Sequence, residues 1–119
     1  MNRFFASFKY ALEGLGHIIK NHPNFKFHLL AALTVLITSI VLKVSATEFI
    51  ILLFGITFVL IAEMINTAIE EITNLVTTEH KKEAKIAKDV GAASVLLASA
   101  LAIIMGIIIF LPYLLRLIS

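Results

Sequence analysis

Three long stretches of the chain are apolar and contain no Asp, Glu, Lys or Arg. They cover residues 27–42, 49–62 and 90–115. A helix rises 1.5 Å per residue, so about 20 residues are needed to cross a bilayer core of about 30 Å. The first stretch is short, the third is ample for a tilted helix, and the second crosses only if it continues to about residue 69. We therefore expect three transmembrane helices, over residues 27–42, 49–69 and 90–115.

Residues 1–26 have a different pattern, in which apolar and polar positions share a helical spacing. The apolar positions are Phe4, Phe5, Phe8, Leu12, Leu15, Ile18 and Ile19, and charged or polar side chains fall largely between them. This pattern predicts an amphipathic helix that lies on the membrane surface. Pro23, in the segment NHPN, is expected to break or restart the helix.

Small residues recur every four positions in the third stretch, at Ser94, Ala98, Ala102 and Gly106. Such a ladder lets helices approach closely in lipid. It predicts packing and carries no information about chemistry.

Composition agrees with a membrane protein of one domain. Of the 119 residues, 60% are hydrophobic, whereas soluble domains average about 45–50% apolar residues. The chain has no cysteine, which excludes disulfides, thiolate metal sites and a cysteine nucleophile. A net charge of +2 lacks the strong positive charge that is typical of nucleic-acid-binding proteins. We expect an all-α membrane protein over residues 1–119.

The basic residues predict the orientation in the membrane. Eight lie before the first span or between the second and third: Arg3, Lys9, Lys20, Lys26, Lys81, Lys82, Lys85 and Lys88. Only Lys43 and Arg116 fall on the other side. By the positive-inside rule, the N-terminus and the polar segment 70–89, expected as a loop, are cytoplasmic.

Polar residues gather at the end of the second span, in the stretch AEMINTAIEE. Glu63, Asn66 and Glu70 stand at i, i+3 and i+7, so they share one helix face. A charge at the centre of a span costs about 2.5–3.5 kcal/mol, and less near its ends. Glu63 is therefore a functional candidate, although it could simply hydrogen-bond a neighbouring helix.

The pair Lys88 and Asp89 stands where the third apolar stretch begins. Asp89 suits a helix N-terminus, where the helix dipole favours negative charge, whereas Lys88 does not. Carboxylates beside a lysine suggest Mg²⁺ and phosphates, because Mg²⁺ prefers a few carboxylate oxygens together with substrate phosphates. A carboxylate can also take a proton from an attacking hydroxyl. Neither GxxxxGK[ST] nor GxGxxG occurs, so such a nucleotide site would be built from helix side chains.

These residues resemble the signature of a known family. The signature E-x-x-N-[ST]-x-x-E, followed after about twenty residues by A-K-D and small residues, is similar to Glu63, Asn66, Thr67, Glu70 and Ala87 to Asp89 here. The chain is identified by this resemblance, which extends over nearly all of it, as a member of the prokaryotic diacylglycerol and undecaprenol kinases. The resemblance implies a homotrimer with active sites shared between neighbours, in the bacterial cytoplasmic membrane.

The resemblance also implies phosphate transfer from Mg·ATP to a membrane lipid alcohol, serving phospholipid or cell-wall carrier metabolism. By position, Glu63 is similar to the catalytic base, Asn66 to a residue that orders the site, and Glu70 to the metal ligand. Glu63 and Ala92 would contact the lipid. The remaining expected contacts with ATP are Arg3, Tyr10, Glu79, His80, Lys81, Lys88 and Asp89.

One position departs from the family pattern. The segment before the first span usually reads E-x-N-F-x-x-H, and here His22 occupies the position of the glutamate that helps hold the metal. A neutral imidazole is a poor ligand for Mg²⁺. The metal count stays open, as does a shift toward Mn²⁺ or Zn²⁺. His80 replaces a loop tyrosine of the family.

Two other functions remain open on the residues alone. An intramembrane Glu beside an Asn is common in ion-coupled membrane proteins, although the chain has no inverted repeat of the kind found in transporters. A non-catalytic membrane protein is the other alternative. Between the two lipid acceptors, the absence of Trp and the EMINTAIE wording favour undecaprenol.

Overall fold

The computed structural model describes residues 2–119 and consists of four helices and short connections. The helices are α1 (Arg3–Asn21), α2 (Pro23–Val41), α3 (Ala46–Val76) and α4 (Lys82–Ile118). The last three are long and apolar enough to cross a membrane. The expected all-α architecture with three candidate spans is confirmed.

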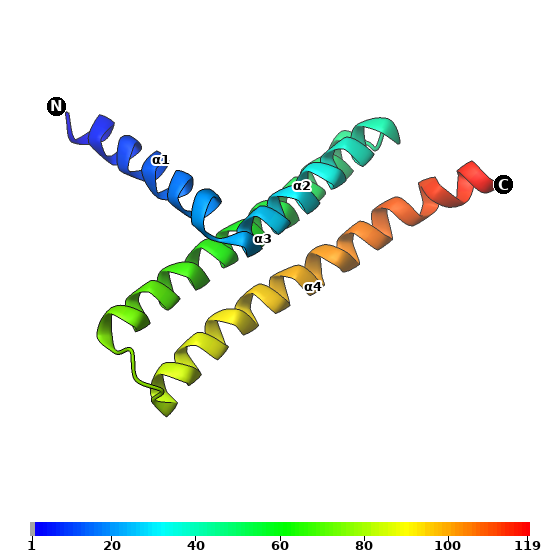
Figure 1. Ribbon diagram of the computed structural model, residues 1–119. Helices are drawn as coiled ribbons and strands as arrows, with labels where there is room; N and C mark the ends of the chain where they lie inside the picture. The colour runs from blue at the N-terminus through cyan, green and yellow to red at the C-terminus, as the bar shows by residue number, and fades with distance from the viewer. Residues whose placement is uncertain (1) are drawn as a thin grey trace.

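The helices form a flat, open arrangement with extents of 57 × 43 × 21 Å. Helices α3 and α4 make a long antiparallel hairpin, and α2 lies along the N-terminal half of α3 (Figure 1). Helix α1 leaves the α1–α2 junction and projects to one side. Most large apolar side chains are exposed, as expected where the surrounding solvent is lipid rather than water.

Pro23 starts a new helix instead of ending the chain's helical run. His22 has an extended backbone (φ −122°, ψ 102°) and caps both neighbouring helices, and Pro23 is the first residue of α2. Proline disfavours the helical conformation in the residue before it and suits the first helical position, where no N–H bond is needed. The first candidate span therefore begins at residue 23, four residues before the uncharged stretch.

The turn between α2 and α3 is closed by a capping box. The Ser45 side chain accepts from the Glu48 N–H (3.1 Å), and the Glu48 carboxylate accepts from the Ser45 N–H (3.0 Å). This exchange satisfies N–H groups that have no partner inside the helix. Lys43 adopts a left-handed conformation (φ 55°) within the turn.

The connection between α3 and α4 is much shorter than the expected loop 70–89. Helix α3 continues to Val76 and α4 begins at Lys82, so only residues 77–81 lie outside the helices. The Thr77 hydroxyl accepts from the Glu79 N–H (3.1 Å) in this turn. Residues 82–88 at the start of α4 are mostly Lys, Glu and Ala, which favour helix. Helices therefore extend beyond the apolar stretches, since hydropathy marks the limit of lipid contact and not the end of a helix.

Small residues bring α3 and α4 together, and part of the ladder on α4 takes part. Ala98 is buried, and a side chain at Gly55 would meet the end of Met105 at 3.2 Å. Gly106, in contrast, borders an apolar groove of about 600 Å³ between α2, α3 and α4, together with Val35, Val59 and other apolar side chains.

A polar contact ties the two ends of the hairpin far from the connecting turn. The Tyr113 hydroxyl of α4 donates to the Glu48 carboxylate at the start of α3, and Arg116 lies over the Tyr113 ring, 5.2 Å from its centroid.

Tyr113→Phe removes this hydrogen bond and keeps the ring. We expect a lower midpoint of reversible unfolding in mixed micelles, because the carboxylate loses a partner. The control is Tyr10→Phe, at an exposed tyrosine of α1; equal midpoints for the two variants would contradict the assignment.

Candidate functional site

A buried polar strip runs along the second half of α3. Glu63 is 5% exposed, and Asn66 and Thr67 are each 7% exposed. The Asn66 amide Nδ2 donates to Glu70 Oε1 at 3.4 Å. The predicted common face of Glu63, Asn66 and Glu70 is therefore present, and it faces the other helices rather than lipid.

The deepest carboxylate has a partner on α2 that the sequence analysis did not assign to the site. His28 of α2 places Nε2 3.7 Å from Glu63 Oε2, close enough for an ion pair when the imidazole is protonated. His28 also lines the apolar groove. The available signal was its place at the end of the N-F-x-x-H segment. The carboxylate thus lies at the boundary between the groove and the polar strip.

Gly91 allows the backbone of α4 to meet Asn66 directly. A Cβ at position 91 would lie 2.4 Å from Asn66 Oδ1 and 3.6 Å from the end of Ile69. Asn66 Oδ1 is itself buried without a hydrogen-bond partner among residues 2–119. An unpaired buried carbonyl oxygen costs stability and remains free to accept from a bound molecule. Sequence reasoning noted the small residues after A-K-D but did not single out Gly91.

Lys88 and Asp89 do not stand at a helix start, and the dipole argument for Asp89 is wrong. Helix α4 begins at Lys82, with Glu83 as the acid of its first turn. Asp89 accepts instead from Lys85 Nζ at 2.6 Å, one turn away on the same helix. Lys88 Nζ donates to Asn74 Oδ1 of α3 at 2.7 Å. No pattern in the sequence selects Asn74 as a site residue.

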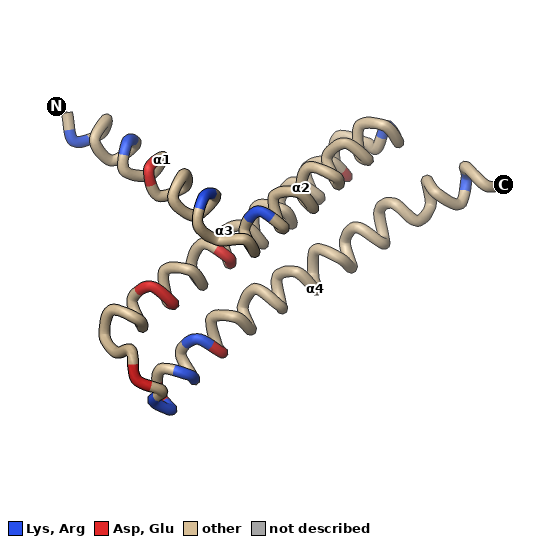
Figure 2. Tube along the Cα trace, viewed as in Figure 1, with Lys and Arg blue, Asp and Glu red and all other residues tan. Residues whose placement is uncertain are grey.

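The turn between α3 and α4 forms a second pocket of about 600 Å³. Five expected nucleotide contacts line it together: Glu79, His80, Lys81, Lys88 and Asp89. Lys82 and Lys85 add further positive charge, and basic residues are concentrated along the chain at this end of the hairpin (Figure 2). Clustered ammonium groups suit the phosphates of a nucleotide, since charge-assisted hydrogen bonds are the stronger ones.

Other expected site residues lie apart from this pocket within a single chain. Arg3 and Tyr10 are exposed on α1, which points away from the α3–α4 turn (Figure 1). Ala92 is exposed on α4. His22 does not face Glu70; its Nε2 lies 3.4 Å from the neighbouring carboxylate, Glu71.

The residues present fit a magnesium ion that arrives with a nucleotide. Glu70 offers one carboxylate beside Asn66. One or two carboxylates are enough when substrate phosphates complete the coordination. The imidazole of His22 does not fit the preference of Mg²⁺ for oxygen.

Comparison with known proteins places these features in a family. The family model for prokaryotic diacylglycerol kinase matches residues 9–110. The undecaprenol kinase of Bacillus subtilis is 39% identical over 112 residues, which cover 94% of this chain and 91% of that protein. The diacylglycerol kinase of Synechocystis is 35% identical over 113 residues (94% and 65%), and that of Haemophilus influenzae 30% over 105 residues (87% and 89%).

The chain belongs to the prokaryotic diacylglycerol kinase family. It is an enzyme of the lipid kinase class, which confirms the expectation drawn from the signature residues. Family membership favours this activity over an ion-coupled or non-catalytic membrane protein.

The contact of Gly91 with Asn66 yields a test of the site. Gly91→Ala places a methyl group against Asn66 Oδ1 and should displace the amide that bonds Glu70. Since a misplacement of about 1 Å in a site can reduce rates on the order of 100-fold, we expect a loss of similar size in lipid phosphorylation by purified protein. Gly14→Ala is the control, because a Cβ there meets nothing within 4 Å. Equal activities of the two variants would contradict a role for this contact.

Proposed function

We propose that the protein transfers the γ-phosphate of ATP to the hydroxyl of a membrane lipid alcohol, with undecaprenol as the acceptor. The observation that carries this is the position of Glu63. The carboxylate is buried on α3, and its partner His28 borders the apolar groove, while the lysine-rich pocket lies further along the same hairpin. A lipid hydroxyl in the groove and a soluble nucleotide in the pocket could then approach one another near Glu63. The similarity to the undecaprenol kinase of Bacillus subtilis favours that acceptor over diacylglycerol.

Glu63 is proposed as the general base. Its carboxylate takes the proton of the lipid hydroxyl while the hydroxyl oxygen forms a bond to the γ-phosphorus, and the bond from that phosphorus to the oxygen of ADP breaks. The His28 imidazole, 3.7 Å from Glu63 Oε2, would hold the carboxylate in position at the end of the groove. Ala92 would lie against the acceptor.

Asn66 and Glu70 are proposed to position the donor. Asn66 donates to one oxygen of Glu70 and so orients the carboxylate that would hold Mg²⁺. That ion supplies neutralisation of the negative charge that develops on the phosphates. The pocket residues Glu79, His80, Lys81, Lys88 and Asp89 would bind the nucleotide.

A homotrimer with shared sites would bring Arg3 and Tyr10 to a nucleotide. Within one chain, both residues lie on α1, away from the α3–α4 turn, so a site closed by them needs α1 of another copy. The three exposed phenylalanines of α1, Phe4, Phe5 and Phe8, support its placement on the membrane surface. We propose that the N-terminus and the turn at residues 77–81 are on the cytoplasmic side of the bacterial cytoplasmic membrane, where ATP is present.

Removing either carboxylate tests the assigned roles. Glu63→Gln should lower turnover by about 10²–10⁴-fold, the usual contribution of a general base. Glu70→Gln should also reduce activity, with partial recovery at high Mg²⁺. The measurement is transfer of labelled phosphate from ATP to lipid in micelles, with assembly checked by cross-linking.

The matched control is Glu83→Gln, in the first turn of α4. It removes an equal charge outside the proposed site and should leave turnover unchanged. Full activity of Glu63→Gln would overturn its role as the base.

The acceptor is tested by supplying undecaprenol and diacylglycerol side by side in the same micelles. We expect a higher kcat/KM for undecaprenol, given the greater similarity to the kinase that carries that name. A preference for diacylglycerol would reverse the proposed acceptor and leave the reaction class intact.

A further inference from the structure

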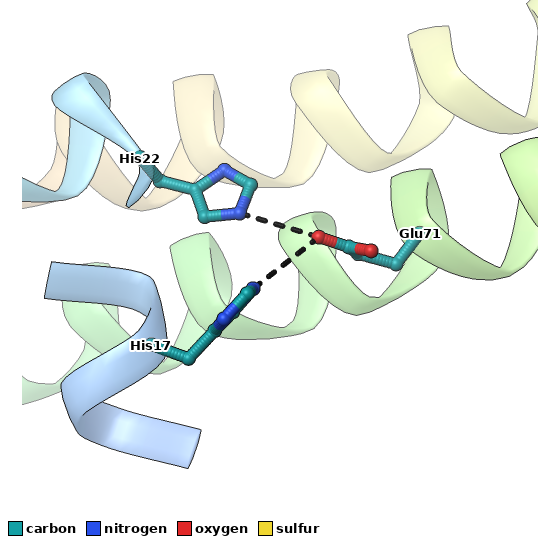
Figure 3. A group of neighbouring side chains, drawn as sticks. All are labelled: His17, His22 and Glu71. Carbon is teal, nitrogen blue, oxygen red and sulfur yellow. Dashed lines mark ion pairs between the residues drawn. The ribbon is translucent and has the colours of Figure 1, made fainter. Parts of the chain in front are cut away.

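Three side chains of metal-ligand type meet where α1, α2 and α3 come together. They are His17 of α1, His22 between α1 and α2, and Glu71 of α3 (Figure 3). Nε2 of His17 lies 3.6 Å from Glu71 Oε1, and Nε2 of His22 lies 3.4 Å from the same oxygen. Both rings therefore converge on one carboxylate oxygen from different segments of the chain.

These separations match the edges of a tetrahedral metal site. Zinc binds histidine nitrogen and carboxylate oxygen at about 2.0–2.2 Å, so neighbouring ligand atoms in a tetrahedron lie about 3.3–3.6 Å apart. The two measured nitrogen–oxygen distances are 3.6 and 3.4 Å, and the three ligand atoms lie within 4.8 Å of one another. For a metal to bind, the ligand nitrogens of His17 and His22, which lie within 4.8 Å of one another, must approach to the same edge length.

The backbone holds His22 in this position. Its N–H donates to the Ile18 carbonyl at 3.0 Å, its own carbonyl accepts from the Phe25 N–H at 3.1 Å, and Pro23 keeps it extended. Ile18 is buried beneath the junction. The His22 side chain is 23% exposed, whereas those of His17 and Glu71 are each 59% exposed, which leaves the outer side open to water.

Asn21 offers the partner that a metal-bound His17 would need. Coordination by Nε2 leaves the ring proton on Nδ1, and the Asn21 side-chain amide lies 3.2 Å from that atom. The amide nitrogen now donates to the His17 carbonyl at 2.9 Å. Rotation of the amide would present its oxygen to Nδ1–H, the kind of hydrogen bond that metal-ligating histidines usually make.

We propose that His17, His22 and Glu71 form a binding site for a divalent ion of the zinc class, with water as the fourth ligand. Two imidazoles and one carboxylate suit zinc and similar transition metals, and they do not suit Mg²⁺. The site is distinct from the proposed nucleotide-associated metal. Glu70 bonds Asn66, and Glu71, the next residue, is turned about 100° around the helix.

The bound ion fastens α1 to α3. Within residues 3–21, Ile18 is the buried residue of α1, so the helix has little other anchorage in a single chain. A metal bridge at its last turns fixes the angle at which α1 leaves the junction.

The test is metal binding by the full chain, purified without a polyhistidine tag and stripped with a chelator. Zn²⁺ alone is titrated by calorimetry, and Co²⁺ is titrated by visible absorption, whose intensity distinguishes four-coordinate from six-coordinate cobalt. We expect one ion per chain and the four-coordinate spectrum. His17→Ala, His22→Ala and Glu71→Gln should each weaken binding by more than the roughly 10–100-fold that loss of an outer hydrogen-bond partner costs.

His80→Ala and Glu83→Gln are the matched controls, because both residues lie away from the junction, and they should bind as the unchanged chain does. Helix content by circular dichroism identifies any variant that fails to fold. Glu71→Gln, at an exposed position, is the substitution expected to disturb folding least. Absence of Zn²⁺ binding, or equal loss in the control variants, overturns the proposal. Neither result depends on kinase activity.

Discussion

The close approach of α4 to Asn66 is the contact on which the rest of the site depends. Gly91 has no Cβ, so the backbone of α4 reaches the Asn66 carbonyl oxygen. Asn66 is buried there, and Glu63 and Thr67 on the same part of α3 are buried as well, so their polar groups avoid lipid. A polar strip of this kind is tolerated in a span only when it faces protein or a water-filled cavity. Close packing at a small residue thus lets polar side chains lie within a membrane-spanning helix without contact with lipid.

The two ends of the hairpin have opposite character. Lysines from the turn and the first turns of α4 surround one pocket, whereas the groove between α2, α3 and α4 is lined almost entirely by apolar side chains. Glu63 and His28 stand between these regions. An enzyme that transfers phosphate from a soluble donor to a lipid alcohol needs this division. Transfer of a charged donor into lipid is unfavourable, and so is exposure of an apolar lipid chain to water.

The junction of α1 and α2 shows how one substitution changes local chemistry. At the position where the family pattern is expected to have a glutamate, this chain has His22, and the structure brings both His22 and His17 to Glu71. The nitrogen ligands favour a different kind of ion from the one that accompanies a nucleotide. In the proposed function, binding of the nucleotide metal would then rest on Glu70 and the substrate phosphates.

Local patterns in the sequence were enough to predict the helical class, the three candidate spans and the common face of Glu63, Asn66 and Glu70. Hydropathy and helical periodicity act within a single segment, so they are readable without the fold. The helix ends were harder to predict, because favourable helix formers such as Lys82 to Lys88 extend helices beyond the apolar stretches. Because the start of α4 was predicted at the start of the apolar stretch, Asp89 was wrongly placed at a helix N-terminus.

Contacts between segments were decided by the tertiary structure alone. The pairing of Glu63 with His28, of Lys88 with Asn74 and of His22 with Glu71 depends on how helices cross and rotate against one another. No periodicity within one helix encodes that rotation, which follows from small residues and side-chain shapes on both partners. The sequence by itself therefore determined which polar residues share one face of α3, and packing determined which groups they meet.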